Sequence, residues 1–356
     1  MSSLPFRLDR ETILEELCDY QERLIRGFSN LSRIDAIDVG VTPRDLIYSE
    51  NKIKLYRYRP LVSNPHEVPV LLVYALVNRP YMVDLQRERS LVRRLLEAGI
   101  DVYLVDWGYP DRSDRFLTLD DYLNGYLANC MEQVCNRHDL EAINLLGICQ
   151  GGTFSLCYSA LHPERVKNLI TMVTPVDFHT DDNRLSHFVR KIEVDALVDT
   201  FGNVPGELLN GAFLSLKPFR SAGQKYVELT DILDSREQAL NFLRMEKWIF
   251  DSPDQAGETF RQFVKNFFQR NSLVSGDVEI GDAKVDLANI SMPILNIYAT
   301  QDHLVPPSSS LPLGQIVGSP DYTVRAFHGG HIGIYVSSRA QKEVPPTIAN
   351  WLRERA

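Results

Sequence analysis

The sequence Gly-Ile-Cys-Gln-Gly at residues 147–151 decides how the rest of the chain is interpreted. An apolar run at residues 142–146 precedes it and predicts a buried strand, and residues 152–161 are expected to form a helix. A strand, a tight turn with a nucleophile between glycines, and a helix form a nucleophile elbow, whose turn a Cβ on either side would crowd. The nucleophile position holds Cys149, and the alternative is a buried cysteine in a glycine-rich turn.

The elbow interpretation gives two residues a chemical role. The positive end of the following helix would favour the thiolate of Cys149. The backbone N–H of Gln150 would donate one hydrogen bond to an oxyanion. Because a thiolate exchanges acyl groups readily with thioesters, cysteine at this position indicates a thioester substrate and an acyl-enzyme that is passed on.

The composition of the chain excludes several classes of protein. With 356 residues, 44% of them hydrophobic and 24% charged, the chain is typical of a globular protein with one large core and an insertion, or with two domains. A net charge of −9 argues against a general nucleic-acid binder. The five cysteines show no zinc-binding spacing, so we expect no metal site and no cofactor, and their odd number fits a reducing cytoplasm. No apolar run reaches about 18 residues and no signal peptide is evident, so no membrane span is expected.

Strand and helix patterns alternate along most of the chain. The first two expected strands suit an antiparallel hairpin, and the later strand–helix alternation predicts a mostly parallel sheet with helices on both faces. The expected strands are residues 45–50, 52–59, 70–75, 101–107, 142–146, 168–173, 293–299 and 322–327, and the expected helices are residues 84–97, 119–135, 152–161 and 345–354.

This alternation is interrupted between residues 177 and 290. There the pattern predicts helices at residues 184–198, 235–247 and 253–269 and no convincing core strand, which is typical of a cap inserted over a site. An amphipathic helix at residues 11–31 precedes the first strand and either packs on its own domain or serves a partner subunit. The predicted domains are an N-terminal helix (residues 1–35), a core (36–176 and 291–356) and a helical cap (177–290).

An acid and a base follow the elbow in the order that the α/β-hydrolase fold requires. Asp302 comes just after the strand that follows the cap, and His331 comes just after the last strand. Taken alone, Asp302 would be a turn residue and His331 a loop histidine, but both positions fit at once. The sequence therefore predicts an α/β-hydrolase fold with a catalytic triad of Cys149, Asp302 and His331.

Two further positions belong to the expected site. The second oxyanion donor should come from the loop at residues 76–78, after the first buried strand, and we place it at Val77. His303, beside Asp302, either caps the turn or contacts a phosphate or hydroxyl group of the substrate.

Five motifs carry a resemblance to a known family. They are Gly-Ile-Cys-Gln-Gly-Gly at residues 147–152, Asp-Trp-Gly at 106–108, Gln-Asp-His-Leu-Val-Pro at 301–306, Gly-Gly-His-Ile at 329–332, and the loop at 77–85. From about residue 40 onward the sequence resembles the polyhydroxyalkanoate synthases. It is most similar to the catalytic subunit of the two-component class III type, because the long N-terminal domain of single-subunit members is missing.

The resemblance implies an acyltransferase that polymerises 3-hydroxyacyl-CoA, in particular 3-hydroxybutyryl-CoA, into polyester. It implies that Cys149 carries the growing chain, that His331 deprotonates Cys149, and that Asp302 helps to activate the 3-hydroxyl group, directly or through His331. The cap would shield the acyl-enzyme from water. The implied partners are a second, non-catalytic synthase subunit in a homo-oligomer or hetero-oligomer, and the surface of a polyester granule in the cytoplasm.

Other functions remain open from the sequence. A cysteine hydrolase of the dienelactone type would be shorter and lack a long cap, and an esterase or depolymerase would normally carry serine. A non-catalytic granule-binding scaffold would not need an intact nucleophile, acid and base. Lys217, Arg220 and Arg190 are either contacts for the CoA phosphates or solvated surface charges.

Overall fold

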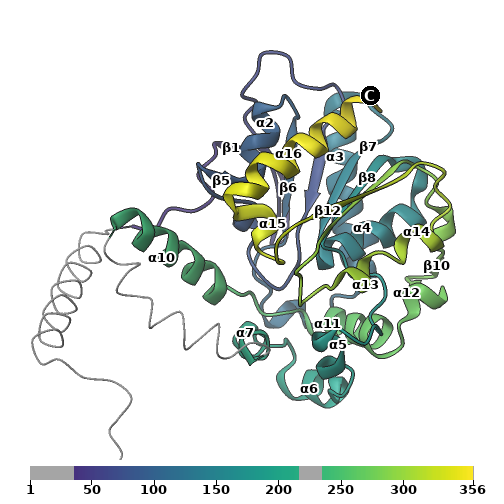
Figure 1. Ribbon diagram of the computed structural model, residues 1–356. Coiled ribbons are helices and arrows are strands. Elements are labelled where there is room, and N and C mark those ends of the chain that lie inside the picture. The colour runs from purple at the N-terminus through teal and green to yellow at the C-terminus, as the bar shows by residue number, and fades with distance from the viewer. Residues whose placement is uncertain (1–35, 216–234, 356) are drawn as a thin grey trace, which may run out of the picture. The chain divides into compact units, whose positions relative to one another are not determined.

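The computed structural model describes residues 36–215 and 235–355 (Figure 1). The chain divides into two compact units. The larger unit contains residues 39–209 and 251–355, and the described part of the smaller one contains residues 36–38, 210–215 and 235–250. The predicted helix at residues 11–31, Lys217 and Arg220 lie outside the described residues, and the domain boundaries stay a prediction.

An eight-stranded sheet forms the centre of the larger unit, with the strand order β1-β2-β6-β3-β7-β8-β11-β12. The first hairpin and the β2–β6 pair are antiparallel, and every other neighbouring pair is parallel. The strands are β1 (Arg44–Glu50), β2 (Ile53–Tyr58), β3 (Val70–Val73), β6 (Val102–Asp106), β7 (Ile143–Ile148), β8 (Val166–Met172), β11 (Ile294–Ala299) and β12 (Tyr322–Phe327). The predicted mostly parallel sheet is confirmed.

Helices flank this sheet because its central strands are apolar on both faces. Every residue of β3 and β7 is buried. Helix α4 (Gln150–Leu161) packs on β7 and β8, α3 (Ala128–His138) packs on β7, and α2 (Leu91–Glu97) lies beside α16 (Ser338–Arg353) (Figure 1). The prediction of an α/β-hydrolase fold is therefore confirmed in its layers as well as in its sheet.

The helix predicted at residues 84–97 is wrong in its first half. Its start forms a small hairpin of β4 (Asp84–Gln86) and β5 (Arg89–Ser90), and α2 begins only at Leu91. The buried carboxylate of Asp84 accepts hydrogen bonds from the backbone N–H and the hydroxyl group of Thr42, at 2.9 and 2.7 Å. This contact with a residue 42 positions away holds Asp84 in an extended conformation, so the local pattern was misleading.

The predicted insertion contains helices near the three expected places, but the helix predicted at residues 184–198 is divided into α5 (Arg184–Val189) and α6 (Val194–Phe201), and one hairpin was not revealed by the pattern. The strands β9 (Val278–Ile280) and β10 (Ala283–Val285) form this antiparallel hairpin, whose Val278, Ile280 and Val285 join the main hydrophobic core. The other described helices of the insertion are α7 (Gly206–Ser215), α10 (Arg236–Phe250), α11 (Gly257–Phe263), the π-helix η6 (Val264–Gln269) and α12 (Ser272–Ser275).

The remaining elements are short or form the other connections. They are η1 (Pro80–Val83), η2 (Arg112–Phe116), the π-helix η3 (Asp121–Leu127), η4 (Pro163–Arg165), η7 (Leu287–Asn289), α13 (Pro307–Ser310), α14 (Leu313–Ile316) and α15 (Gly333–Val336). The helix predicted at residues 119–135 is thus π-helical in its first half and ends three residues later, with α3.

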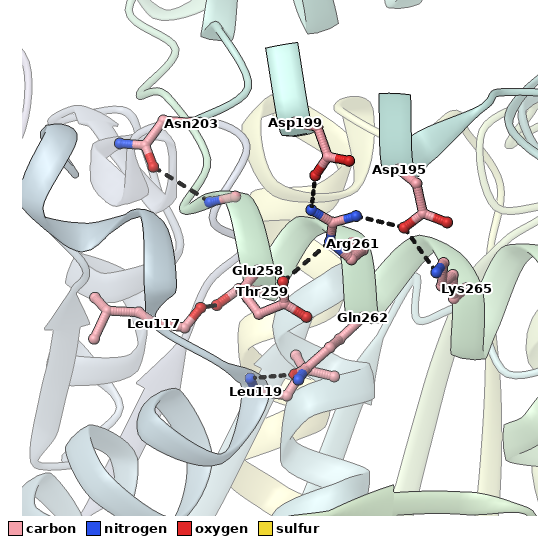
Figure 2. Close-up of polar contacts among 11 residues, drawn as sticks. Leu117, Leu119, Asp195, Asp199, Asn203, Glu258, Thr259, Arg261, Gln262 and Lys265 are labelled. Carbon is pink, nitrogen blue, oxygen red and sulfur yellow. Dashed lines mark hydrogen bonds and ion pairs between the residues drawn. The ribbon is translucent and has the colours of Figure 1, made fainter. Parts of the chain in front are cut away.

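Helix α6 is held on α11 by a group of ion pairs (Figure 2). The guanidinium of Arg261 pairs with Asp195, with Asp199 at 2.6 Å and with Glu258 at 3.0 Å. Beneath these charges lies a small apolar cluster that includes Val198 and Val264. Because the carboxylates of Asp195 and Asp199 are mostly exposed, we expect the apolar cluster to contribute more to this contact than the ion pairs do.

Candidate active site

Cys149 lies between β7 and α4 with backbone angles φ 55° and ψ −124°, which side-chain-bearing residues rarely adopt. The glycines around it are required by space. A Cβ at Gly147 would lie 2.5 Å from the Cα of Gly152, and a Cβ at Gly151 would lie 2.3 Å from the carbonyl oxygen of Val73. The chain therefore has the backbone geometry of a nucleophile elbow, with the Cys149 thiol at the end of a central strand.

Cys149 also differs from the other cysteines of the described chain. Cys130, Cys135 and Cys157 are buried, whereas Cys149 is partly exposed. Burial raises the pKa of the Cys130 thiol and of the Cys157 thiol to about 12, so both stay protonated at neutral pH. Among these four cysteines, Cys149 is the accessible candidate for a nucleophile.

The acid and the base meet at the carboxyl ends of two neighbouring strands. Asp302 follows β11 and His331 follows β12, and these strands pair in parallel, so their ends lie together. Nδ1 of His331 lies 2.6 Å from Oδ2 of Asp302, and both side chains are buried. The other carboxylate oxygen of Asp302 accepts hydrogen bonds from the backbone N–H groups of Leu304 and Val305, each at 2.9 Å. The carboxylate is thus fixed before any substrate binds.

The charge state of His331 follows from its surroundings. Burial alone would lower its pKa, but the negative charges of Asp302 and Cys149 and hydrogen bonds to both outweigh burial, so the pKa of His331 lies well above its ordinary value. Cys149 is thus close enough to the imidazole to act on its charge state. The arrangement favours a protonated imidazole beside the sulfur that would attack an acyl group.

The two expected oxyanion donors lie in segments that are joined by a hydrogen bond. Gln150 is the first residue of α4, and its side-chain oxygen Oε1 accepts the backbone N–H of Leu76 at 2.9 Å. Since the Leu76 N–H is engaged in this bond, the candidates left in the loop at residues 76–78 are Val77 and Asn78. Val77 is half-buried beside this anchor, and its assignment stays a prediction.

His303 and Arg190 are two other positions that the sequence analysis named. His303 is half-buried in the loop that begins with Asp302. Arg190 is the C-cap of α5, where its guanidinium donates a hydrogen bond to Nδ1 of His187 at 2.7 Å on an exposed surface. This contact favours the interpretation of Arg190 as surface charge.

Two buried tyrosines near Cys149 were not identified from the sequence. Tyr74 follows β3, and Tyr335 lies in α15, one helical turn after His331, with its ring centroid 6.4 Å from that of His331. Burial, the charge of Cys149 and, for Tyr335, the nearby Tyr74 raise the pKa of both phenols, so both stay neutral. The spacing of four residues from His331 was the available signal for Tyr335.

The Asp-Trp-Gly motif at residues 106–108 forms hydrogen bonds with the loop after β3. Asp106 accepts hydrogen bonds from Nη2 of Arg79 at 2.7 Å and from the backbone N–H of Gly108 at 3.0 Å. The indole N–H of Trp107 donates to the carbonyl oxygen of Tyr74 at 2.9 Å. The motif thus holds the loop that carries the expected second oxyanion donor.

Within residues 36–215 and 235–355, no group of three or more histidine, cysteine, aspartate or glutamate side chains is arranged to hold a metal ion. In the same part of the chain, no helix is both long enough and apolar enough to span a membrane.

Two family models match the sequence. The model described as the alpha/beta hydrolase fold matches residues 68–338. The model described as the N-terminus of poly-beta-hydroxybutyrate polymerase (PhaC) matches residues 12–95.

Among curated proteins, the chain is similar to poly(3-hydroxyalkanoate) polymerase subunits named PhaC. It is 56% identical to that of Thiocystis violacea and 58% identical to that of Allochromatium vinosum, in each case over 99% of both chains. It is 54% identical to that of a Synechocystis species over 99% of this chain and 96% of the relative.

Solved structures with this fold are more distant in sequence. A monoacylglycerol lipase of Paleococcus ferrophilus matches with a TM-score of 0.53 at 17% identity, over 85% of this chain and 99% of the other. A structure from work on carboxylesterases of Nitrososphaera gargenis matches with a TM-score of 0.52 at 15% identity, over 88% of this chain and 98% of the other. At this level of identity the likeness shows the fold alone.

Proposed function

This chain belongs to the family of poly(3-hydroxyalkanoate) polymerase subunits named PhaC, and from that premise we propose that it builds polyester from 3-hydroxyacyl-CoA through an acyl-enzyme on Cys149. Members of this family with the α/β-hydrolase fold are acyltransferases. The proposal goes further in naming the coenzyme A thioester, with 3-hydroxybutyryl-CoA as the first substrate to test, the release of CoA and the attacking atom.

The observation that carries the proposal is the meeting of a partly exposed cysteine on a strained elbow with a buried histidine–aspartate pair whose N···O distance is 2.6 Å. In the first step, the Cys149 thiolate attacks the carbonyl carbon of the thioester. The resulting oxyanion accepts hydrogen bonds from the backbone N–H groups of Gln150 and Val77. Collapse of this intermediate breaks the bond to the CoA sulfur, which leaves with the proton of the His331 imidazolium.

In the second step, His331 acts as a base. The hydroxyl group of another 3-hydroxyacyl-CoA attacks the acyl-enzyme, His331 accepts the hydroxyl proton, and an ester forms as the Cys149 thiolate leaves. The lengthened CoA thioester can then acylate Cys149 again, as in the first step. The Asp302 carboxylate holds Nδ1 of His331 and helps the imidazole to accept the hydroxyl proton, so it matters more in the second step than in the first. Cysteine suits this sequence because the intermediate is a thioester, from which an alcohol can take the acyl group.

The proposal extends to partners and location. We propose a second synthase subunit and a polyester granule in the cytoplasm as the surfaces that this chain contacts. The word "subunit" in the names of the relatives supports a partner. Exposed aromatic side chains support an apolar contact, in particular Phe116 and Phe201, which are 70% and 54% exposed.

Incubation of the full-length chain with 3-hydroxybutyryl-CoA tests the function. We expect CoA release together with turbidity from insoluble polymer, and faster release when a co-purifying second subunit is present. Release of CoA with soluble 3-hydroxybutyrate would instead indicate a hydrolase. Neither CoA release nor polymer, with and without the co-purifying subunit, would indicate a non-catalytic granule-binding protein.

A further inference from the structure

Two glutamines hold the backbone on either side of Leu76, in the loop after β3. The side-chain oxygen of Gln150 accepts the Leu76 N–H at 2.9 Å. The side-chain nitrogen Nε2 of Gln255 donates to the Leu76 carbonyl oxygen at 3.1 Å, in a buried contact. That carbonyl belongs to the same peptide group as the N–H of Val77, which we have assigned as an oxyanion donor.

Gln255 is itself buried and held by hydrogen bonds of its side chain and of its backbone. Its side chain is 3% exposed, and its Nε2 also donates to the carbonyl oxygen of Pro253 at 3.0 Å. Because both contacts of Nε2 are carbonyl oxygens, only the donor orientation of the amide is possible. Its backbone N–H and C=O form a two-way bridge with Val204, at 2.9 Å in each direction. The amide therefore reaches Leu76 from a rigid base.

A second contact joins the same two segments. The side-chain nitrogen of Asn78 donates to the hydroxyl group of Ser252 at 2.7 Å. Residues 252–255 thus contact the loop after β3 on both sides of Val77, at Leu76 and at Asn78. These residues follow directly on α10, within the stretch of sequence that interrupts the α/β pattern.

We propose that Gln255 is a positioning residue for the oxyanion hole, acting through the peptide group that joins Leu76 to Val77. The inference rests on the proposed function, because it requires an oxyanion at Cys149. A peptide group is planar, so a hydrogen bond that fixes the direction of its C=O also fixes the opposite direction of its N–H. The same bond polarises the amide and makes its N–H a stronger donor.

Gln150 completes the arrangement. Its own N–H is the first expected oxyanion donor, and its side chain holds the N–H of Leu76, one peptide group before the second donor. The two donors are therefore fixed relative to each other by Gln150 and relative to residues 252–255 by Gln255. A displacement of residues 252–255 would turn the Val77 N–H away from the oxyanion, so the rate of acylation depends on how this segment is seated.

The test compares acylation with alkylation of the same thiol. Gln255→Met keeps the length of the side chain but removes the donor. With 3-hydroxybutyryl-CoA in a single turnover, we expect acylation of Cys149 to slow by about ten- to hundredfold, with the loss in the maximal rate rather than in KM. Iodoacetamide alkylates a thiolate without forming an oxyanion, so its rate should stay within about twofold of that of the parent chain.

Gln262→Met is the matched control. Gln262 lies seven residues after Gln255, in α11, where its side-chain oxygen accepts the N–H of Leu119 at 2.8 Å (Figure 2). Its loss removes a similar hydrogen bond to a different loop, so both rates should stay near those of the parent chain. Equal losses of acylation and alkylation in Gln255→Met, or no loss of either, would overturn the inference.

A second variant covers the case in which Gln255→Met does not fold. In Gln255→Glu the ionised carboxylate cannot donate, whereas the protonated form can. The ratio of acylation rate to alkylation rate should therefore rise toward the parent value as the pH falls, and a ratio that does not change with pH would contradict the inference. If the parent chain itself forms no acyl-Cys149, the proposed function fails and the inference fails with it. If the parent chain is acylated and the Gln255 variants are acylated at the same rate, the inference alone is overturned.

Discussion

The elbow around Cys149 and the contact between α6 and α11 keep their parts in place by different physical means. At the elbow, the backbone around Gly151 packs directly against the backbone of Val73 and Tyr74. The position where a Cβ of Gly151 would lie is 2.3 Å from the carbonyl oxygen of Val73, so no side chain can move aside to make room. At the α6–α11 contact, Arg261 reaches carboxylates that are largely exposed to water, over a small apolar cluster.

The difference indicates which part of the chain tolerates change. The elbow has one backbone geometry and fails if it is altered, because covalent geometry and close packing leave no alternative. The ion pairs of the insertion are screened by salt and can be replaced at small cost. Substitutions in these two regions should therefore differ in effect by orders of magnitude, and the predictions below run from the largest effect to the smallest.

We expect Gly151→Ala to lower the rate of CoA release by about a hundredfold or more, or to prevent folding. The reason is that the new Cβ would collide with the backbone of Val73 and Tyr74. CoA release and a thermal unfolding curve check both outcomes. Gly125→Ala is the matched control, since a Cβ there meets no atom within 4 Å, and it should leave activity unchanged. A folded and active Gly151→Ala chain would show that the elbow is less rigid than its contacts indicate.

We expect the base and the acid to contribute unequally to the two steps. His331→Gln should slow acylation of Cys149 by about a thousandfold or more, because the base that activates the thiol is lost. Asp302→Asn should still allow acylation and should slow chain elongation more strongly. Single-turnover acylation and polymer length measure the two steps separately. Equal loss of acylation in both variants would show that Asp302 serves mainly to orient His331.

The raised pKa of His331 predicts a pH dependence of stability. Since the pKa of the folded state lies above the unfolded value, the contribution of His331 is complete below about pH 6.5 and declines as the pH rises through the folded-state pKa. The stabilisation that His331 provides, measured by urea unfolding of the parent chain and of His331→Gln, should be largest near about pH 6 and should shrink as the pH rises through the folded-state pKa. A difference that grows with pH would mean that His331 is neutral in the folded protein.

The smallest effect is expected at the ion pairs of α6 and α11. Arg261→Ala should lower the unfolding midpoint by only about 1–3 °C at low salt, and less at high salt, while acylation of Cys149 stays within about twofold. Arg59→Ala, which breaks an exposed pair with Asp45 at the edge of the sheet, is the control and should have no larger effect. A large loss that salt does not reduce would contradict the interpretation of Arg261 as a screened surface contact.

The sequence was sufficient where the determinants of structure are local. The glycines and the apolar run around Cys149 define the elbow by themselves, and the chain order placed Asp302 and His331 at strand ends that the parallel pairing of β11 and β12 then brings together. The bond between Asp302 and His331 could be expected, because the fold fixes which strand ends meet.

The sequence was insufficient where a partner lies far away in the chain. The conformation of Asp84 depends on Thr42, and the three-residue strands β9 and β10 are stable only against the core around α4. The contact of Gln255 with Leu76 joins residues 179 positions apart, so no periodicity could have indicated it. Local patterns thus indicated the candidate reacting groups, and the structure was needed to show which contacts position them.

The central claim is that Cys149 carries the acyl group. The most direct measurement is mass spectrometry of peptides from the full-length chain, quenched in acid during reaction with 3-hydroxybutyryl-CoA. We predict one or more added 3-hydroxybutyryl units on Cys149, located by fragmentation of its peptide, and none on Cys130, Cys135 or Cys157. Acylation of another residue, or full CoA release by Cys149→Ala, would contradict the account.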